Sequence, residues 1–207
     1  MKLGSHNTMT YLKPQWWVRP FSFMAKCQNR SLKSQIQCGA ELFDLRVVFE
    51  DGVPHFAHGV AIYRELDVYS TICMLDIYSM KHFNETGEYF YVRIINEHNE
   101  HFKEFVKFCR EIEHDFPHLR FFGGNNKKDW RTLYFFKNDL RVIDKYASCN
   151  HDRCKKDGHK EIEHKNNTGS ILDDLCPRIY AWLFNKKWRN EYRGENVYLM
   201  QDFIGTY

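Results

Sequence analysis

The chain has 207 residues, of which 43% are hydrophobic and 28% charged, so it can bury a core and is not a disordered chain. Lysine and arginine number 30 and aspartate and glutamate 27, and a net charge of only +3 argues against a polycationic nucleic-acid-binding protein. No apolar run approaches the roughly 20 residues that a membrane-spanning helix needs.

The first clear strand is predicted at residues 42–49 (LFDLRVVF), because apolar residues there alternate with Asp44 and Arg46 at a period of two. A glycine and a proline then mark a turn, and residues 54–58 are predicted to return as a short strand. Asp44 and Arg46 therefore share one face of the pleat. An exposed ion pair on an antiparallel strand is the alternative interpretation of these two residues.

The middle of the chain is predicted to alternate between helices and strands. Residues 63–83 are predicted as a helix, and residues 89–95 (YFYVRII), which are rich in β-branched and aromatic side chains, as a strand. Apolar residues from Phe102 to Phe116 recur at helical spacing, and Pro117 predicts the end of that helix.

A long polar loop is predicted at residues 149–167, after two short strands at 133–136 and 140–143. The loop carries cysteines and histidines, whose thiolates and imidazoles are suitable zinc ligands. Their spacing, C-x-H-x₂-C-x₄-H-x₄-H, matches no zinc finger known to us. A structural zinc site is therefore kept as an alternative only, and no metal is predicted.

Near the end of the chain, Ser170 and Asp173 resemble a capping box for a helix that reaches about Trp182 and is interrupted near Pro177. Residues 196–204 (NVYLMQDFI) are predicted as the closing strand.

Strands that alternate with helices are typical of α/β proteins with parallel strands. We therefore expect an α/β fold, a compact and irregular (β/α) barrel of the TIM type, as one domain over residues 1–207. Because such barrels normally have about 250 residues, some helices must be short or missing.

Polar residues lie where strands end, in the segments GSHNT (4–8), DLR (44–46), AHG (57–59) and QDF (201–203). In a β/α barrel the active site lies at the carboxyl ends of the strands. Two histidines, an arginine and a carboxylate are sufficient to cleave a phosphodiester. A neutral histidine removes a proton, a protonated histidine donates one, and arginine binds the phosphate oxygens with two N–H groups. A carboxylate behind the basic histidine holds its tautomer.

The runs GSHNTMTYL, GAELFDLRV and DGVPHFAHG, in this order, resemble the phosphatidylinositol-specific phospholipase C family in its bacterial, metal-independent type. The likeness continues in YVRIINE, VIDKY and NVYLMQDFI and covers most of residues 2–204. It implies that the chain has the barrel of phospholipase C-like phosphodiesterases.

The resemblance implies roles for five residues at the catalytic centre. His6 would be the general base, His58 the general acid, Arg46 the phosphate ligand and Asp202 the residue that orients His6. Arg46 stands where calcium-dependent members carry a calcium-binding carboxylate, so no metal or other cofactor is expected. Asn7 stands where the bacterial pattern has an aspartate. It can hydrogen-bond Arg46 or the phosphate, but it supplies no charge.

The resemblance also implies a set of residues that would bind the substrate. They are Asp44, Asn96, Lys137, Asp144 and Tyr146. The implied reaction is attack of a neighbouring ring hydroxyl on phosphorus, which yields diacylglycerol and a cyclic inositol phosphate, followed by slower hydrolysis of the cyclic ester. The alternatives are a phosphodiesterase of the same fold that acts on a soluble glycerophosphodiester or nucleotide, and a binding module that has lost turnover.

A phospholipid or other phosphodiester is the expected partner, nucleic acid is not, and a monomer is expected. Residues 1–6 contain no apolar segment of a secretory signal, which predicts a cytoplasmic location with reduced thiols. Trp16 and Trp17, with Lys13 and Arg19, could contact a membrane surface transiently. Packing at the rim of the core is the alternative interpretation of the two tryptophans.

Overall fold

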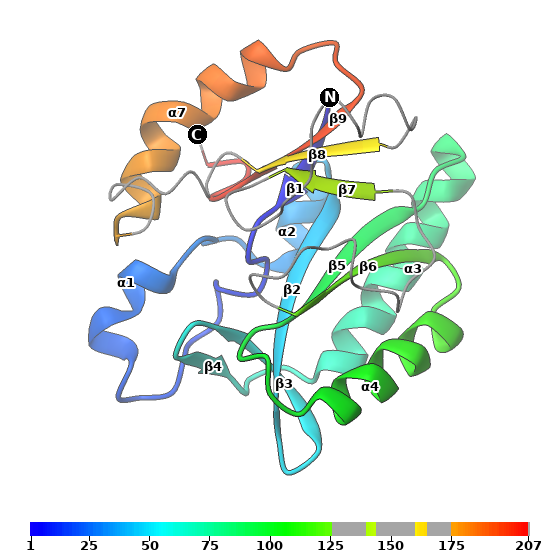
Figure 1. Cartoon of the computed structure of the whole chain (residues 1–207). Coiled ribbons are helices and arrows are strands. Elements are labelled where there is room, and N and C mark those ends of the chain that lie inside the picture. Colours follow the sequence, from blue (N-terminus) through cyan, green and yellow to red (C-terminus); the bar gives the residue numbers. More distant parts are fainter. Residues whose placement is uncertain (126–139, 144–159, 165–174, 207) are drawn as a thin grey trace.

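The computed structural model describes residues 1–125, 140–143, 160–164 and 175–206, which form an α/β fold around one sheet (Figure 1). The strands are β1 (Lys2–Ser5), β2 (Ala40–Glu50), β3 (Val53–His58), β4 (Ala61–Tyr63), β5 (Phe90–Asn96), β6 (Leu119–Asn125), β7 (Leu140–Ile143), β8 (Lys160–His164) and β9 (Val197–Gln201). The helices are η1 (Arg19–Phe21), α1 (Ser22–Ala25), α2 (Leu32–Gln37), α3 (Val68–Thr86), α4 (Phe102–Asp115) and α7 (Pro177–Glu191).

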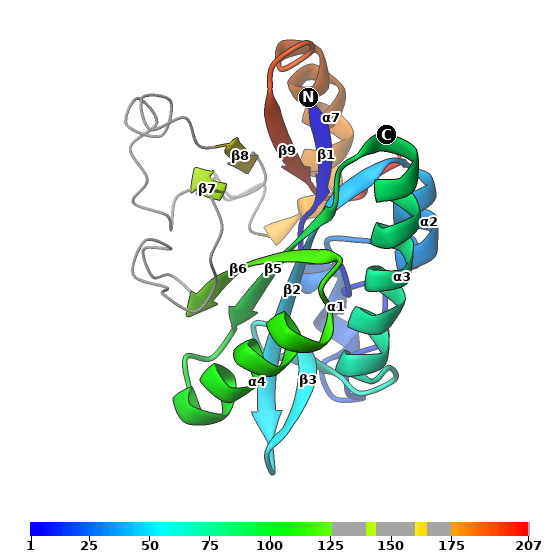
Figure 2. The ribbon, with the colours of Figure 1, turned by 90° about the vertical axis from the view of Figure 1, so that its right-hand side faces the viewer.

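Most of the sheet is parallel, in the order β6-β5-β2-β1-β9-β8-β7. Strand β3 pairs antiparallel with the second half of β2, beyond the end of β1, and β4 pairs antiparallel with β3. Within the described part of the chain, no pairing joins β6 to β7, so the curved sheet is not closed. Figure 2 shows α2 and α3 along the outer side of this sheet.

Two apolar clusters fill the two faces of the sheet. The larger cluster packs the outer face of β2 and β5 against α3 and α4. The smaller cluster lies on the inner face and consists of Leu42, Tyr91, Phe122, Tyr198 and Met200. Because side chains alternate along a strand, Asp44 and Arg46 share the inner face with Leu42. The inner face of β2 is therefore apolar at Leu42 and becomes polar toward the carboxyl end of the strand.

Gly4 in β1 lies where the central strands approach each other closely. A Cβ atom at this position would be 3.1 Å from Leu42 Cδ2 and 3.3 Å from Met200 Cα. A side chain would therefore push β2 or β9 away from β1, and residues of the candidate site lie in β2 and directly after β1 and β9.

The α/β fold is confirmed, and so is the strand predicted at 42–49, which is the central part of β2. The predictions for 54–58, 89–95 and 140–143 also agree with strands β3, β5 and β7. The helix from Phe102 is confirmed as α4, which ends at Asp115.

The start of the predicted helix 63–83 was wrong. Tyr63 belongs to β4, and α3 begins at Val68 because the side chain of Asp67 accepts a hydrogen bond from the backbone N–H of Ser70. Alternation over residues 61–63 is too short to separate a strand from the first turn of a helix.

Three predictions near the end of the chain need correction. Residues 149–167 are not loop throughout, because Lys160–His164 forms β8 between β7 and β9. The helix does break near Pro177 as predicted, since Leu175 is helical, Cys176 is not, and Pro177 starts α7, where its missing N–H costs nothing, but α7 reaches Glu191 instead of ending near Trp182. The closing strand stops at Gln201, where the chain turns toward the site. The strand predicted at 133–136 and the capping box at Ser170 lie outside the described residues.

Candidate active site

The structure brings together the five residues predicted for the catalytic centre, and Asn7 lies beside His6 in sequence. His6 follows β1, Arg46 lies in β2, His58 ends β3, and Asp202 follows β9. The rings of His6 and His58 have their centroids 6.4 Å apart and are inclined by 74°. Since β3 runs antiparallel to β2, with Phe56 opposite Val47, its last residue, His58, extends one position past the level of Arg46.

His6 is buried and its tautomer follows from its neighbours. Nδ1 lies 2.7 Å from Asp202 Oδ1, and because a carboxylate only accepts, Nδ1 carries the proton. Nε2 lies 3.0 Å from Arg46 Nη2, which can only donate. Nε2 of His6 is therefore unprotonated in this arrangement and its electron pair accepts hydrogen bonds, as a general base requires.

His58 is held from the opposite side by the backbone of α1. Its Nδ1 lies 2.7 Å from the carbonyl oxygen of Ala25, so Nδ1 donates and Nε2 faces the cluster. Burial lowers the pKa of His58, and the positive charge of Arg46 lowers it further, while Glu97 and the Ala25 carbonyl act in the opposite direction.

Arg46 forms ion pairs with two buried carboxylates at the site. Its Nε donates to Asp44 Oδ2 at 3.2 Å and its Nη1 to Glu97 Oε2 at 3.1 Å. Burial alone would lower the pKa of Arg46, but the charges of Asp44 and Glu97 outweigh it and raise the pKa, so the guanidinium stays a cation. Asp44 is completely buried, which contradicts the interpretation of Asp44 and Arg46 as an exposed surface pair.

Glu97 was not singled out from the sequence, although it belongs to this cluster. It follows β5, is 6% exposed, and accepts from the backbone N–H of Gly59 at 2.8 Å through Oε1. It thus connects Arg46 with the turn after His58. Glu97 could have been selected from the sequence because, like Asp202, it comes directly after a strand.

Asn7 lies at the centre of the cluster. Its backbone has a φ of 44°, a left-handed conformation that asparagine tolerates, and its N–H donates to Asp44 Oδ2 at 3.1 Å. Its Nδ2 lies 3.0 Å from His6 Nε2 and 3.1 Å from His58 Nε2. The side chain therefore contacts the predicted base and the predicted acid at the same time.

Of the predicted substrate-binding residues, Asp44 lies in the cluster and Asn96 does not. Asn96 pairs in register with Val47, on the outer face of the sheet, and its Nδ2 donates to the carbonyl of Glu100 at 2.7 Å. The basic residue on the inner face of β5 is Arg93, whose Nε lies 3.8 Å from Asp44 Oδ1. Lys137, Asp144 and Tyr146 lie outside the described residues.

One group of potential metal ligands occurs in the part of the chain that the structure describes. His6, Cys27 and Asp202 each offer an atom within 4.8 Å of the others. The Nδ1 atom of His6 is already hydrogen-bonded to Asp202. Burial raises the pKa of the Cys27 thiol well above its ordinary value, and the charge of Asp202 raises it further. The thiol therefore stays protonated, and this group is better described as a hydrogen-bonded cluster. The alternative zinc loop lies largely outside the described residues.

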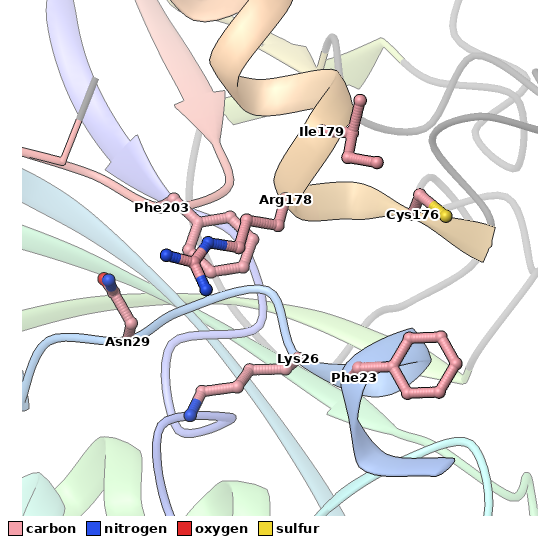
Figure 3. Close-up of a pocket in the computed structure, with 7 residues that line it drawn as sticks. All are labelled: Phe23, Lys26, Asn29, Cys176, Arg178, Ile179 and Phe203. Atoms are coloured by element: carbon pink, nitrogen blue, oxygen red, sulfur yellow. The ribbon is translucent and has the colours of Figure 1, made fainter.

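A pocket of about 250 Å³ lies beside the cluster, between the segment around α1 and the start of α7 (Figure 3). One part of its lining is basic or polar and the other is apolar. The lining residues are Phe23, Lys26, Asn29, Cys176, Arg178, Ile179 and Phe203. Phe203 directly follows Asp202, and its backbone N–H donates to the carbonyl of Cys27 at 2.7 Å. The pocket is thereby connected with two residues of the cluster.

No protein-family model and no curated protein matches this sequence. Among solved structures, the phosphatidylinositol-specific phospholipase C from Listeria monocytogenes matches with a TM-score of 0.68 and 17% identity, over 98% of this chain and 87% of that chain. A mutant of the phosphatidylinositol-specific phospholipase C from Staphylococcus aureus matches with a TM-score of 0.68 and 15% identity, over 100% of this chain and 87% of that chain. The chain therefore has the barrel-like fold of these bacterial enzymes, as the sequence resemblance predicted. None of the described helices is long and apolar enough to cross a membrane.

Proposed function

We propose that this chain is a phosphodiesterase of the phospholipase C type that cleaves phosphatidylinositol-like diesters without a metal ion. The observation that carries the proposal is the meeting of two imidazoles and one guanidinium. Arg46 Nη2 is 3.0 Å from His6 Nε2, and His58 Nε2 lies across Asn7 from it. The similarity in fold to phosphatidylinositol-specific phospholipases C supports the same reaction class.

In the proposed reaction, a hydroxyl adjacent to the phosphodiester attacks phosphorus. His6 Nε2 takes the hydroxyl proton, and Asp202 stabilises the resulting imidazolium. As the bond from phosphorus to the leaving oxygen breaks, the protonated form of His58 donates its Nε2 proton to that oxygen. Arg46 offers N–H groups to the non-bridging oxygens, where negative charge grows in the transition state.

The charges around Arg46 support a mechanism without a metal ion. Asp44 and Glu97 are the acidic residues beside Arg46, the proposed phosphate ligand, and both already bind the guanidinium. A dication would have to displace Arg46 or share its carboxylates with it, at a cost in like-charge repulsion. The guanidinium itself supplies the positive charge that a metal ion would bring.

Exposed apolar side chains on residues 16–23 and on α7, two of which line the pocket, support a lipid substrate over a soluble diester. Trp16 and Trp17 are 77% and 54% exposed, so packing at the rim of the core, the alternative interpretation, leaves more than half of each side chain uncovered. Further exposed apolar residues on the same segment and on α7 are Phe21, Phe23, Ile179, Trp182 and Leu183. Exposed apolar patches mark binding surfaces. We propose that this surface touches the membrane while the cluster acts on a headgroup.

Phosphatidylinositol vesicles are expected to lose their headgroup to the purified chain at the same rate with and without a chelator. Phosphorus NMR would follow the products, and a cyclic phosphate should appear before any open monoester. A matched lipid with its 2-hydroxyl methylated should not be cleaved, because the attacking group is blocked. Cleavage of the methylated lipid, or loss of activity with chelator, would contradict the proposed mechanism.

The same assay separates the two alternatives. Turnover of glycerophosphodiesters or nucleotides, with none of vesicles, would indicate a phosphodiesterase for soluble substrates. Binding of vesicles without turnover of any diester would indicate a module that has kept the fold and lost the reaction.

Replacing Ile179 with serine is expected to weaken vesicle binding by about three- to tenfold, since a half-exposed isoleucine gains part of the roughly 1.5–3 kcal/mol of a full apolar burial. Cleavage of a soluble substrate such as glycerophosphoinositol should not change. Ile77→Ser is the matched control, because Ile77 lies on α3 and is 47% exposed, against 48% for Ile179. Vesicle sedimentation measures both variants, and an equal loss in both would refute a specific membrane-binding surface.

A further inference from the structure

Asn7 bridges the two imidazoles through one nitrogen atom. Its Nδ2 lies 3.0 Å from His6 Nε2 and 3.1 Å from His58 Nε2, and a third, longer contact reaches Cys27 Sγ at 3.4 Å. In both histidines Nδ1 is already committed to an oxygen acceptor. Whether each Nε2 atom is protonated therefore depends on whether Asn7 donates a hydrogen bond to it or accepts one from it.

An amide NH₂ group has two protons and no acceptor electron pair. Placed between the two Nε2 atoms, it can donate one proton to each, but only when both nitrogens are unprotonated. This arrangement therefore fits a pair of neutral imidazoles. The proposed reaction needs a different state, in which His6 is neutral and His58 carries a proton on Nε2.

The other amide atom can serve that second state. Asn7 Oδ1 is buried and has no hydrogen-bond partner among the described residues. Rotation of the side-chain amide by half a turn exchanges Oδ1 with Nδ2 at nearly unchanged shape. The oxygen would then accept from a protonated Nε2. Because Oδ1 has no partner, the present orientation is held by the contacts of Nδ2 with the imidazoles, so their protonation decides which orientation is stable.

We propose that Asn7 is a positioning residue that links the protonation of His6 and His58. Its NH₂ group stabilises the two imidazoles when neither carries a proton on Nε2. Its oxygen stabilises them when one Nε2 carries the catalytic proton. The inference rests on the proposed function for its role in turnover, but it concerns the free protein. Protonation of His58, the proposed general acid, is then coupled to rotation of the Asn7 amide.

The remaining charged groups at the pair are fixed by the fold. Asp202 faces His6 from the end of β9, Glu97 faces His58 from the end of β5, and Asp44 and Arg46 face both from β2. The buried Cys27 thiol contacts Asn7. Variants of Asn7 leave all of these groups in place, so a change in titration reports on the bridge.

Two variants separate the two functions of the amide. Asn7→Asp places only acceptors between the imidazoles, which favours a proton on Nε2. Asn7→Gly removes the bridge and tolerates the left-handed backbone at φ 44°. Both keep the backbone N–H that donates to Asp44. Asn99→Asp is the matched control, since Asn99 is exposed and has a φ of 58°.

Nitrogen-15 NMR of the histidine rings in the free full chain measures the titration of Nε2 directly, with signals assigned by their loss in His6→Ala and His58→Ala. The midpoint for the first protonation of the pair should rise in the order wild type, Asn7→Gly, Asn7→Asp. The last variant should lie roughly 1–3 pH units above the wild type, the usual effect of an opposite charge at this distance. Asn99→Asp should titrate like the wild type.

A wild-type midpoint above that of Asn7→Gly would overturn the inference, because the amide would then stabilise the proton instead of opposing it. An unchanged midpoint in Asn7→Asp would overturn it as well. In turnover of phosphatidylinositol vesicles, the alkaline decline of kcat/KM should move to higher pH in Asn7→Asp. If the chain cleaves no diester at all, the order of midpoints still decides the inference, and only the proposed function fails.

Discussion

Replacing His6 with alanine is expected to lower kcat for phosphodiester cleavage by about 10²–10⁴-fold, and His58→Ala by a similar factor, because each removes one partner of general acid–base catalysis. The double variant should be only slightly slower than either single variant, since groups that act in one step are not additive. Steady-state kinetics on phosphatidylinositol vesicles would measure all three.

His118→Ala is the matched control for this experiment. His118 also binds a carboxylate through Nδ1, at 2.9 Å from Asp76 Oδ2, but it lies outside the cluster and is partly exposed. Its removal should leave kcat unchanged. Wild-type rates in His6→Ala or His58→Ala would show that the cluster is not the active site.

Loss of fold must be separated from loss of chemistry in His6→Ala. The variant deprives Asp202, which is 1% exposed, of a partner at 2.7 Å. Loss of a buried hydrogen-bond partner costs about 1–3 kcal/mol, so a lower unfolding midpoint in denaturant is expected. The circular dichroism spectrum should stay that of the wild type below this midpoint.

The residues predicted for the catalytic centre come together in the structure, and they could be selected because they lie in, or just after, strands that alternation makes visible. In the middle of β2, Phe43, Leu45 and Val47 point outward while Asp44 and Arg46 point inward, so the period of two identified both charged residues. The same reasoning, applied one residue past the end of β5, would have identified Glu97. The selection of Asn96 was instead guided by family likeness, and alternation places it on the opposite face.

Other features depend on contacts that no local pattern encodes. Strand β8 has the charged sequence of a loop, and it is a strand because β7 and β9 pair with it on both sides. The hydrogen bond from His58 to the carbonyl of Ala25 joins segments 33 residues apart, one of them a one-turn helix that has no periodic signal. Tertiary contacts outweigh local propensity in both cases.

Arg46→Lys is expected to lower kcat by about 10²–10³-fold, the usual loss when one donor to a transition-state oxyanion is removed. The reason is geometric. The guanidinium reaches Asp44 with Nε, Glu97 with Nη1 and His6 with Nη2, all within 3.2 Å. A lysine ammonium is a single point and cannot span these three partners while it also binds phosphate.

The loss should appear in kcat more than in KM, because the charge that attracts the phosphate is kept while the fork that stabilises the transition state is lost. Arg64→Lys is the matched control, since Arg64 makes a two-pronged pair with Glu50 through Nε at 2.9 Å and Nη2 at 2.6 Å on the exposed surface. It should be as active as the wild type.

If an Arg46→Lys variant regained activity on addition of calcium, the result would indicate that the ion replaces the guanidinium. Asp44 and Glu97, no longer bridged by the guanidinium, would then form an oxygen-rich position of the kind that calcium prefers. In the wild type Arg46 binds both carboxylates, so calcium should neither activate nor inhibit it. Activation of the wild type by calcium would contradict the role of Arg46 as the built-in cation of this site.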